Sequence, residues 1–455
     1  MSFLSELSSK RVLLIGAGTT GAGLIDFLSE RVSELHIFDE KVSDLSGRKV
    51  VNELPGGEID LAVVSPGWKK NHPVIEKLRQ SNVQILSELD LAWVVKEEVN
   101  PDQKWVAITG TNGKTTTVQM LESILKEAKV NAIACGNVGY PAIAAVSDPA
   151  NFELLALELS SFQIDWAELP EFEAIAILNI AEDHIDWHGS FSNYANAKLK
   201  LLEMSKCAIL NLSEPEIILR SASWAGKKIF FGLDTPQAGE IGLVEELLVD
   251  RAFVTSPEAA ELFAELSDIK PTVPHNVANA MAAGGLALAL GIPHPVVKAG
   301  LASFELDHHR LELVKASNDV NWVNDSKATN PHAASAALAS SLSNIWIAGG
   351  LAKGAKMESL IQKSAPRIKA AILIGTDREL IGQALTKYAP HVSQHRIDSD
   401  GTSQELMDLV VKKAIELAEP GDTVLLAPAC ASMDQFKSYA ERGSTFASAV
   451  ERLVK

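Results

Sequence analysis

A glycine loop between an apolar run and a helical run constrains this chain more than any other feature. Residues 105–117 have the sequence WVAITGTNGKTTT. Gly110 and Gly113 allow a tight turn with inward-facing backbone N–H groups, so a phosphate can rest on them and on the positive end of the following helix. Lys114 then reaches the terminal phosphates, and the Thr115 hydroxyl suits Mg²⁺, which prefers oxygen ligands. The pattern predicts a strand, a phosphate loop and a helix that together bind a nucleoside triphosphate.

The loop is a shortened variant of the common P-loop spacing, because Ile108 stands where that spacing has its first glycine. A chance Gly-Lys-Thr tripeptide is common. Such a tripeptide is rarely found by chance between strand-like residues (106–109) and helix-like residues (118–128). We therefore interpret the loop as a phosphate site.

Length, charge and hydropathy narrow the class of protein. At 455 residues the chain exceeds one ordinary core, and about 150 residues per domain predicts three domains. A net charge of −17 argues against a nucleic-acid partner, and a hydrophobic content of 47% is typical of an α/β enzyme. No apolar run is long enough to cross a bilayer and the first residues do not resemble a signal peptide, so we expect a cytoplasmic protein without a membrane span. Three scattered cysteines favour reduced thiols.

Residues 1–98 carry a second glycine pattern. Gly16, Gly18 and Gly21 follow a short apolar run, and a second run ends at Asp39, about twenty residues later, as in a dinucleotide fingerprint. An NAD-dependent oxidoreductase is therefore one alternative. Since the unit ends near residue 98, it is short for a complete dinucleotide fold, and we interpret it as a site for a nucleotide diphosphate.

Residues 99–306 contain further candidate site residues. The run 153–158 is apolar on both faces and places Glu158 at the end of a buried strand, where an ionised carboxylate needs a cation. Glu158 is a candidate magnesium ligand, or alternatively the partner of a structural Arg or a helix N-terminus. His184 and His188 have the spacing of a helical zinc pair, but the surrounding residues indicate a loop, which favours one functional histidine. By pattern alone, Lys198 and Lys200 are solvated helix lysines.

Residues 307–455 contain apolar runs at 344–350, 370–375 and 423–428, each ending at Gly or Pro, as strands do when their loops bind ligands. Residues 234–270 are rich in Glu and Leu and carry no motif or periodicity that predicts their structure. The predicted fold is three consecutive α/β domains, each with a mostly parallel sheet: a Rossmann-like domain (1–98), a P-loop domain (99–306) and a second Rossmann-like domain (307–455).

Seven ordered motifs give the whole chain a family resemblance. They are TGTNGKTT (109–116), GNVG (136–139), LELSSFQ (157–163), LNIAEDH (178–184), HNVANAMAA (275–283), NDSKATN (324–330) and PACASMDQFKSYAERG (428–443). The chain resembles the Mur ligases, ATP-dependent amide-forming enzymes of peptidoglycan synthesis. The last motif is most similar to the branch that adds D-glutamate to UDP-N-acetylmuramoyl-L-alanine. The resemblance implies that ATP phosphorylates the substrate carboxylate and that the glutamate amine attacks the acyl phosphate.

The resemblance also implies the roles of individual residues. Thr115 and Glu158 hold one magnesium ion, and His184 and Lys198 serve a second, with Lys198 converted to a carbamate. Catalysis is assigned to Lys114, His184 and Lys198. The ATP contacts are Gly110, Asn112, Gly113, Lys114, Thr115, Thr116, Asn279, Arg310 and Asp325. The UDP-sugar contacts are Gly18, Thr19, Thr20, Asp39, Ser65, Gly67, Asn137 and Ser160. The glutamate contacts are Lys327, Thr329, Lys353, Ser432 and Tyr439.

Several alternatives stay open at this point. The amino acid is D-glutamate or L-glutamate, because both present the same charges. A folylpolyglutamate synthase shares the shortened phosphate loop, but it would not need the N-terminal glycine unit. A non-catalytic nucleotide-binding regulator would bind ATP without releasing phosphate. We expect ATP and Mg²⁺ as cofactors, the muramoyl nucleotide and glutamate as small-molecule partners, and a monomer.

Overall fold

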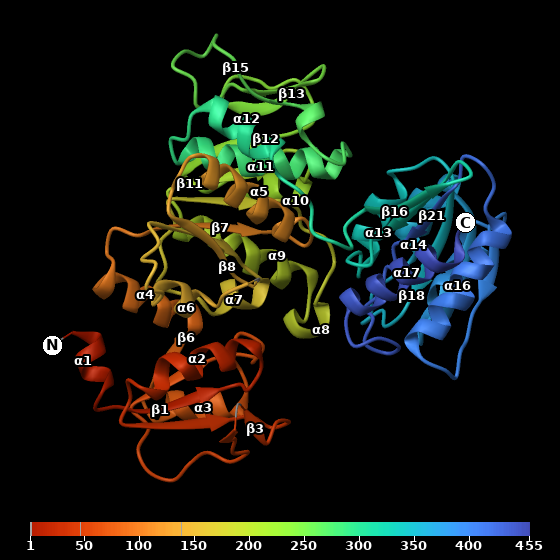
Figure 1. Cartoon of the computed structure of the whole chain (residues 1–455). Coiled ribbons are helices and arrows are strands. Elements are labelled where there is room, and N and C mark those ends of the chain that lie inside the picture. The colour runs from red at the N-terminus through yellow and green to blue at the C-terminus, as the bar shows by residue number, and fades with distance from the viewer. Residues whose placement is uncertain (1, 46, 138) are drawn as a thin grey trace. The chain divides into compact units, whose positions relative to one another are not determined.

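The computed structural model describes residues 2–45, 47–137 and 139–455, and these form two compact units (Figure 1). Unit 1 comprises Met1–Ile180 and Ser192–Phe304, and unit 2 comprises Ala181–Phe191 and Glu305–Lys455. Each unit is built on mostly parallel sheets, which confirms the predicted α/β class. Among the described helices, none has the length and apolar character needed to cross a bilayer.

The first sheet of unit 1 is four-stranded and parallel, in the order β2-β1-β5-β6. Its strands are β1 (Arg11–Ile15), β2 (Glu34–Phe38), β5 (Leu61–Val64) and β6 (Gln84–Ser87), and its helices are α2 (Thr19–Ser29), α3 (Pro73–Gln80) and α4 (Glu88–Val99). The chain leaves β1 toward β2 on one side and returns to β5 on the other. The loops after β1 and β5 therefore meet at a topological switch point, where α/β proteins bind ligands.

The second sheet of unit 1 has nine strands in the order β15-β14-β13-β12-β11-β10-β7-β9-β8. Its parallel part consists of β7 (Lys104–Thr109), β8 (Ala132–Gly136), β9 (Leu154–Glu158), β10 (Ala174–Ile177), β11 (Cys207–Asn211) and β12 (Lys227–Phe231), and it continues into β13, which is parallel to β12. Ile108 pairs with Glu158 and Thr109 pairs with Ile177. The phosphate loop that follows β7 thus starts between the carboxyl ends of β9 and β10. Helices α5 (Lys114–Glu127), α11 (Pro274–Ala289) and α12 (His294–Ala302) pack together in this unit.

The uninterpreted residues 234–270 extend this sheet. They form β13 (Glu240–Val244), β14 (Leu247–Asp250) and β15 (Glu261–Glu265), with both β13–β14 and β14–β15 antiparallel. The two-residue connection between β13 and β14 begins with Glu245 at φ +55°. Such turns normally carry Asn or Gly at positive φ, so this hairpin lacks its usual sequence signal.

Unit 2 contains a six-stranded sheet in the order β16-β17-β21-β18-β19-β20, parallel except for β16. The strands are β16 (Glu312–Ser317), β17 (Val320–Asn324), β18 (Asn344–Gly349), β19 (Ile368–Ile374), β20 (Ser393–Arg396) and β21 (Thr423–Leu426). Trp346 and Ala348 of β18 face a core with α13 (Pro331–Leu338), α14 (Glu358–Ser364) and α15 (Arg378–Tyr388). Ile345 and Ile347 face a second core with α16 (Ser403–Leu417) and α17 (Tyr439–Leu453). Helices on both faces give the predicted Rossmann-like architecture.

A buried carboxyl gives unit 1 a pH-dependent stability. Glu88, the first residue of α4, is 2% exposed, and its Oε1 accepts the N–H of Ile143 at 3.0 Å in α6 (Ala142–Val146). Burial raises the pKa of Glu88 from 4.5 to about 7, so the folded state binds more protons than the unfolded state between these two values. Stability is therefore lost as the pH rises toward 7.

We expect this single group to lower the free energy of unfolding by about 2 kcal/mol between pH 5 and pH 8. Urea unfolding of Glu88→Gln should show a flatter pH dependence, because the neutral amide replaces the carboxyl. Glu58→Gln is a matched control, since the Glu58 side chain is 93% exposed, and it should keep the wild-type dependence. A wild-type pH slope in Glu88→Gln would contradict the role of this carboxyl.

Candidate active site

The phosphate loop is held in shape by side chains from a neighbouring strand end. Asn179, just after β10, donates from Nδ2 to the Asn112 carbonyl (3.1 Å) and accepts the Asn112 N–H on Oδ1 (2.8 Å). The Asn179 carbonyl also accepts the Thr111 N–H at 2.9 Å. Gly113 has φ +84° and is the N-cap of α5. The loop is therefore ordered by the protein itself, with the helix N-terminus directly behind it.

Lys114 lies over this loop. Its Nζ donates to the carbonyls of Gly110 (2.9 Å) and Thr111 (3.0 Å). Thr115 and Thr116 occupy the first turn of α5, with Thr115 partly exposed and Thr116 buried. The order strand, loop, lysine and helix is the one the sequence predicts.

Lys198 reaches the same loop from another element. It lies on α9 (Phe191–Leu199), is 2% exposed, and donates from Nζ to the carbonyl of Gly110 (2.8 Å) and to Thr109 Oγ1 (3.3 Å). The ammonium also lies 4.9 Å from the centroid of the Tyr194 ring. The pattern-only interpretation of Lys198 as a solvated lysine is wrong, because α9 packs this face against the loop. Lys200 is partly exposed and pairs with Glu168.

Glu158 supplies a carboxylate near the phosphate loop that Lys114 and Lys198 contact. It is 2% exposed, and its Oε1 accepts a hydrogen bond from Asn137 Nδ2 at 3.0 Å. Its Oε2 is buried and accepts no hydrogen bond from any described residue. An ionised oxygen in this state is costly unless a cation meets it, so the geometry fits a metal ion at this position.

Asn279 connects α11 to the loop. A Cβ placed on Gly113 would lie 2.4 Å from Asn279 Oδ1, and Asn279 is 6% exposed. The side-chain amide therefore lies against Gly113, the N-cap of α5. The resemblance places Asn279 near adenine, and the structure brings it to the back of the phosphate loop.

His184 belongs to unit 2. It is the N-cap of α8 (Ile185–His188), has φ +52°, and its side chain is 40% exposed with Nε2 3.6 Å from Asp183 Oδ2. Ile185–His188 form one helical turn where the sequence indicates a loop, but His184 lies outside it as the N-cap, so the two histidines do not share a helix. Within the described ranges, no three His, Cys, Asp or Glu side chains gather closely enough to hold a metal by themselves.

The remaining predicted ATP contacts lie together in unit 2. Asp325 follows β17, and its Oδ1 accepts the N–H of Leu311 at 3.3 Å. Desolvation raises the pKa of Asp325 to about 7, although the Leu311 N–H and the charge of Arg310 lower it. A cation at Arg310 and an acid that titrates near neutrality therefore occupy one site.

The predicted glutamate contacts follow β17, β18 and β21, which are neighbours in the sheet. Lys327 Nζ lies 3.9 Å from the ring centroid of Tyr439, the first residue of α17. Leu351 pairs with Ala431, which places the loop of Lys353 beside the loop of buried Ser432. The other predicted contact is Thr329, whose N–H donates to the Lys327 carbonyl.

Arg442 is a residue of this region that the sequence did not single out. It is 1% exposed and donates to Ser326 Oγ (3.0 Å), the Ser326 carbonyl (3.0 Å) and the Cys430 carbonyl (3.1 Å). It thereby ties the Lys327 loop to the Ser432 loop. Its position in the motif PACASMDQFKSYAERG (428–443) was the signal that could have found it.

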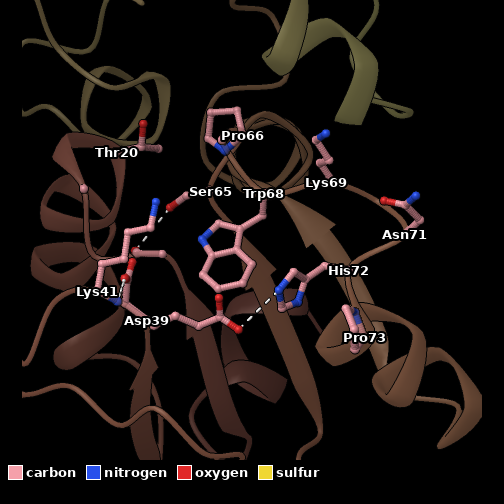
Figure 2. Close-up of a pocket in the computed structure, with 14 residues that line it drawn as sticks. Thr20, Asp39, Lys41, Ser65, Pro66, Trp68, Lys69, Asn71, His72 and Pro73 are labelled. Atoms are coloured by element: carbon pink, nitrogen blue, oxygen red, sulfur yellow. Dashed lines mark hydrogen bonds and ion pairs between the residues drawn. The ribbon is translucent and has the colours of Figure 1, made fainter. Parts of the chain in front are cut away.

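A cavity of about 710 Å³ opens at the switch point of the four-stranded sheet (Figure 2). Its lining includes the predicted contacts Gly18, Thr20, Asp39, Ser65 and Gly67. A Cβ on Gly16 would lie 2.7 Å from Ser65 Cβ, which shows how closely the two loops approach. The Thr19 side chain lies outside the described part of the structure.

Two predicted contacts lie elsewhere among the described residues: Asn137 binds Glu158, and Ser160 caps helix α7 (Ser161–Trp166) through Gln163. Asp39 holds the glycine loop itself, because its Oδ2 accepts the Ala17 N–H at 2.9 Å and its Oδ1 the Lys41 N–H at 2.8 Å.

Sequence reasoning missed the aromatic wall of this cavity. Trp68 stands in the middle of Figure 2, with its ring edge-on to His72 at a centroid distance of 4.7 Å. His72 Nε2 lies 3.3 Å from Glu40 Oε1. A large aromatic residue immediately after the strand-ending Ser65-Pro66-Gly67 turn was the signal that could have found it.

Comparison with known proteins identifies the family to which this fold and these residues belong. Residues 108–287 match the family model of the Mur ligase middle domain, and residues 309–430 match that of the Mur ligase glutamate ligase domain. The UDP-N-acetylmuramoylalanine--D-glutamate ligase of Thermobifida fusca is 42% identical over 98% of this chain and 99% of its own. The enzyme of the same name from Streptomyces avermitilis is 44% identical over 99% of this chain and 100% of its own. This chain belongs to the Mur ligase family.

Solved Mur ligases share the fold. A MurF from Acinetobacter baumannii superposes with a TM-score of 0.60 at 16% identity, covering 99% of this chain and 93% of that one. The MurF of Thermotoga maritima in complex with ADP gives a TM-score of 0.58 at 16% identity, covering 99% and 97%. The Mur ligase resemblance and the α/β fold predicted from the sequence are thus both confirmed.

The contact between Gly113 and Asn279 leads to a first prediction for the Mur ligase phosphate loop. Gly113→Ala adds a Cβ at a left-handed φ and within 2.4 Å of Asn279 Oδ1, so the loop must shift. We expect kcat/KM for ATP to fall at least about tenfold, which corresponds to about 1.4 kcal/mol. Gly56→Ala is the control, since its added Cβ would meet nothing within 4 Å. Unchanged ATP kinetics in Gly113→Ala would refute the loop's sensitivity.

Proposed function

We propose that this Mur ligase joins D-glutamate to UDP-N-acetylmuramoyl-L-alanine at the expense of ATP. The observation that carries the proposal is the convergence of Lys114 and Lys198 on the carbonyl of Gly110, with the buried carboxylate of Glu158 nearby. The two relatives named for this reaction support the identity of the substrates.

The chemistry requires an anionic carboxylate to approach an anionic γ-phosphate. The carboxylate oxygen attacks phosphorus, the bond between the β- and γ-phosphates breaks, and an acyl phosphate forms. The glutamate amine then attacks the acyl carbon, the new C–N bond forms, the C–O bond to phosphate breaks, and the amine loses a proton. Lys114 and the loop N–H groups offset the accumulating negative charge at fixed positions, which is how phosphoryl transfer is accelerated.

Magnesium is the cofactor that the family resemblance implies. Thr115 and Glu158 would hold one ion, and the buried Oε2 of Glu158, which accepts no hydrogen bond from the described residues, fits that role. His184 and a carbamate on Lys198 would serve the second. When bound, the ions neutralise charge on the phosphate oxygens. Because the described side chains include no cluster of three ligands, phosphates and waters would complete the coordination.

The substrate sites follow from the same proposal. The 710 Å³ cavity of residues 1–98 would bind the UDP part of the muramoyl nucleotide. Arg310 and Asp325 of residues 307–455 would contact ATP, together with Asn279 of residues 99–306. The carboxylates of glutamate would meet the cations Lys327 and Lys353, with hydroxyls from the remaining contacts. The three-domain division, a cytoplasmic location and a monomeric state belong to this proposal.

Phosphate release tests the proposal directly. The purified chain receives ATP, Mg²⁺ and UDP-N-acetylmuramoyl-L-alanine with D-glutamate, L-glutamate or other amino acids in parallel. We expect phosphate release with D-glutamate only, and none when Mg²⁺ is chelated. A parallel arm supplies tetrahydrofolate and L-glutamate, the substrates of a folylpolyglutamate synthase. Release with L-glutamate but not D-glutamate, or with tetrahydrofolate only, would overturn the assignment.

A further inference from the structure

A group of contacts away from the phosphate loop ties the wall of the N-terminal cavity to the nine-stranded sheet. Trp166, the last residue of α7, is 5% exposed and donates its indole N–H to the carbonyl of Trp68 at 2.7 Å. The two residues are 98 positions apart in the chain. The residues that make these contacts are Trp68, Lys70, Trp166, Glu168 and Lys200.

Two lysines reinforce the indole hydrogen bond. Lys70 Nζ donates to the Asp165 carbonyl at 2.5 Å and lies 5.6 Å from the centroid of the Trp166 ring. Lys200 Nζ donates to Glu168 Oε1 (2.7 Å) and to the same Asp165 carbonyl (3.1 Å). The end of α7 is thus held by one cation from the cavity loop and one from the 3₁₀ helix η1 (Lys200–Met204), which follows α9.

The opposite side of this segment is held by α4. Asp90 Oδ1 accepts the N–H groups of Glu168 (2.8 Å) and Leu169 (2.9 Å). A second, smaller cavity of about 240 Å³ lies here, and its lining includes Lys70, Asp90, Trp166 and Glu168. The polar groups that fix residues 165–169 therefore come from several elements, so the segment has little freedom to shift.

The two ends of α7 lie next to two different sites. At its C-terminal end, Trp166 contacts Trp68, which lines the 710 Å³ cavity (Figure 2). At its N-terminal end, the helix is capped by Ser160 and Gln163, and Ser160 lies two residues after Glu158. The Glu158 backbone is itself locked, since Glu158 pairs with Ile108 in the sheet. One short helix thus joins the carboxylate of the phosphate site to the aromatic wall of the cavity.

We propose that Trp166 is a positioning residue, which sets the Trp68 wall of the cavity relative to Glu158 and thereby governs binding of the muramoyl nucleotide. The inference rests on the proposed function, because it assigns the cavity to the nucleotide part of that substrate. Without the indole donor, the partly buried Trp68 carbonyl loses this partner, and the loop of residues 65–73 can move.

Trp166→Phe tests the role, because it keeps an aromatic ring beside Lys70 and removes only the N–H donor and part of the ring. We expect KM for UDP-N-acetylmuramoyl-L-alanine to rise about five- to tenfold, while KM for ATP stays within twofold and kcat within threefold. Lys70→Met should act in the same direction. The double variant should show less than the product of the two effects, since the residues are in contact. Trp224→Phe is the matched control, because Trp224 is a partly exposed tryptophan outside the helices and strands and lines neither cavity, and it should leave both KM values unchanged.

Calorimetric binding of the muramoyl nucleotide and of ADP separates this inference from the proposed function. Weaker binding of the muramoyl nucleotide alone in Trp166→Phe supports the positioning role even if turnover is absent. Equal affinities in wild type and variant, or equal losses for both ligands, would overturn it. Should Trp166→Phe fail to fold, Lys70→Met decides on the same readouts. A wild-type chain that binds the nucleotide but releases no phosphate would refute the proposed function and leave the inference standing.

Discussion

Replacing Lys114 with methionine is expected to lower kcat at least about hundredfold while the fold is retained. Lys114 Nζ lies on the carbonyls of Gly110 and Thr111, at the mouth of the phosphate loop. Its charge is needed most when the γ-phosphoryl group is in transit, and losing one such stabilising group costs about 3 kcal/mol of barrier. Methionine has a similar length, so packing against the loop changes little.

Phosphate release under saturating substrates measures this effect. Lys126→Met is the control, because Lys126 is an exposed lysine in the last turn of the same helix, and it should turn over at the wild-type rate. A Lys114→Met enzyme that keeps more than a tenth of the wild-type kcat would remove Lys114 from the catalytic machinery.

The phosphate loop could be predicted from the sequence because its parts are adjacent in the chain. Gly110, Gly113 and Lys114 lie within five residues, and the positive φ of Gly113 together with the N-terminus of α5 follows from local geometry. Glu158 was found for a similar reason, since an apolar run ending in an acid indicates a buried strand with a charged end. Local pattern was sufficient in both cases.

Lys198 shows where local pattern fails. Its helical spacing is that of a solvated lysine, and only the packing of α9 decides that its ammonium is buried at Gly110. The family resemblance corrected this, but periodicity could not. The hairpin of β13 and β14 could not be predicted for a different reason. Glu245 adopts positive φ in its turn, where a glycine or asparagine would normally indicate the turn in the sequence.

The aromatic wall of the cavity could not be predicted from the sequence for a third reason. The indole of Trp166 and the carbonyl of Trp68 meet across 98 residues, and a hydrogen bond to a backbone carbonyl leaves no trace in the residue type at the accepting position. Trp68 and His72 could have been suspected from their place after a strand end. Their pairing with each other and with Glu40 depends on the folded loop.

Lys198→Met is expected to lower kcat at least about hundredfold with little change in thermal stability. The wild-type ammonium is buried on Gly110 and Thr109, so the substitution removes either a cation or, after carbamate formation, a metal-binding anion from the phosphate site. Intact-mass spectrometry in bicarbonate buffer tells these two forms apart: a labile adduct of one CO₂ on the wild type, absent from Lys198→Met, identifies the carbamate. Lys206→Met is the control, since that lysine is 63% exposed and pairs only with Glu173 among the described residues. Wild-type turnover in Lys198→Met would exclude the residue from catalysis, whichever form the amine takes.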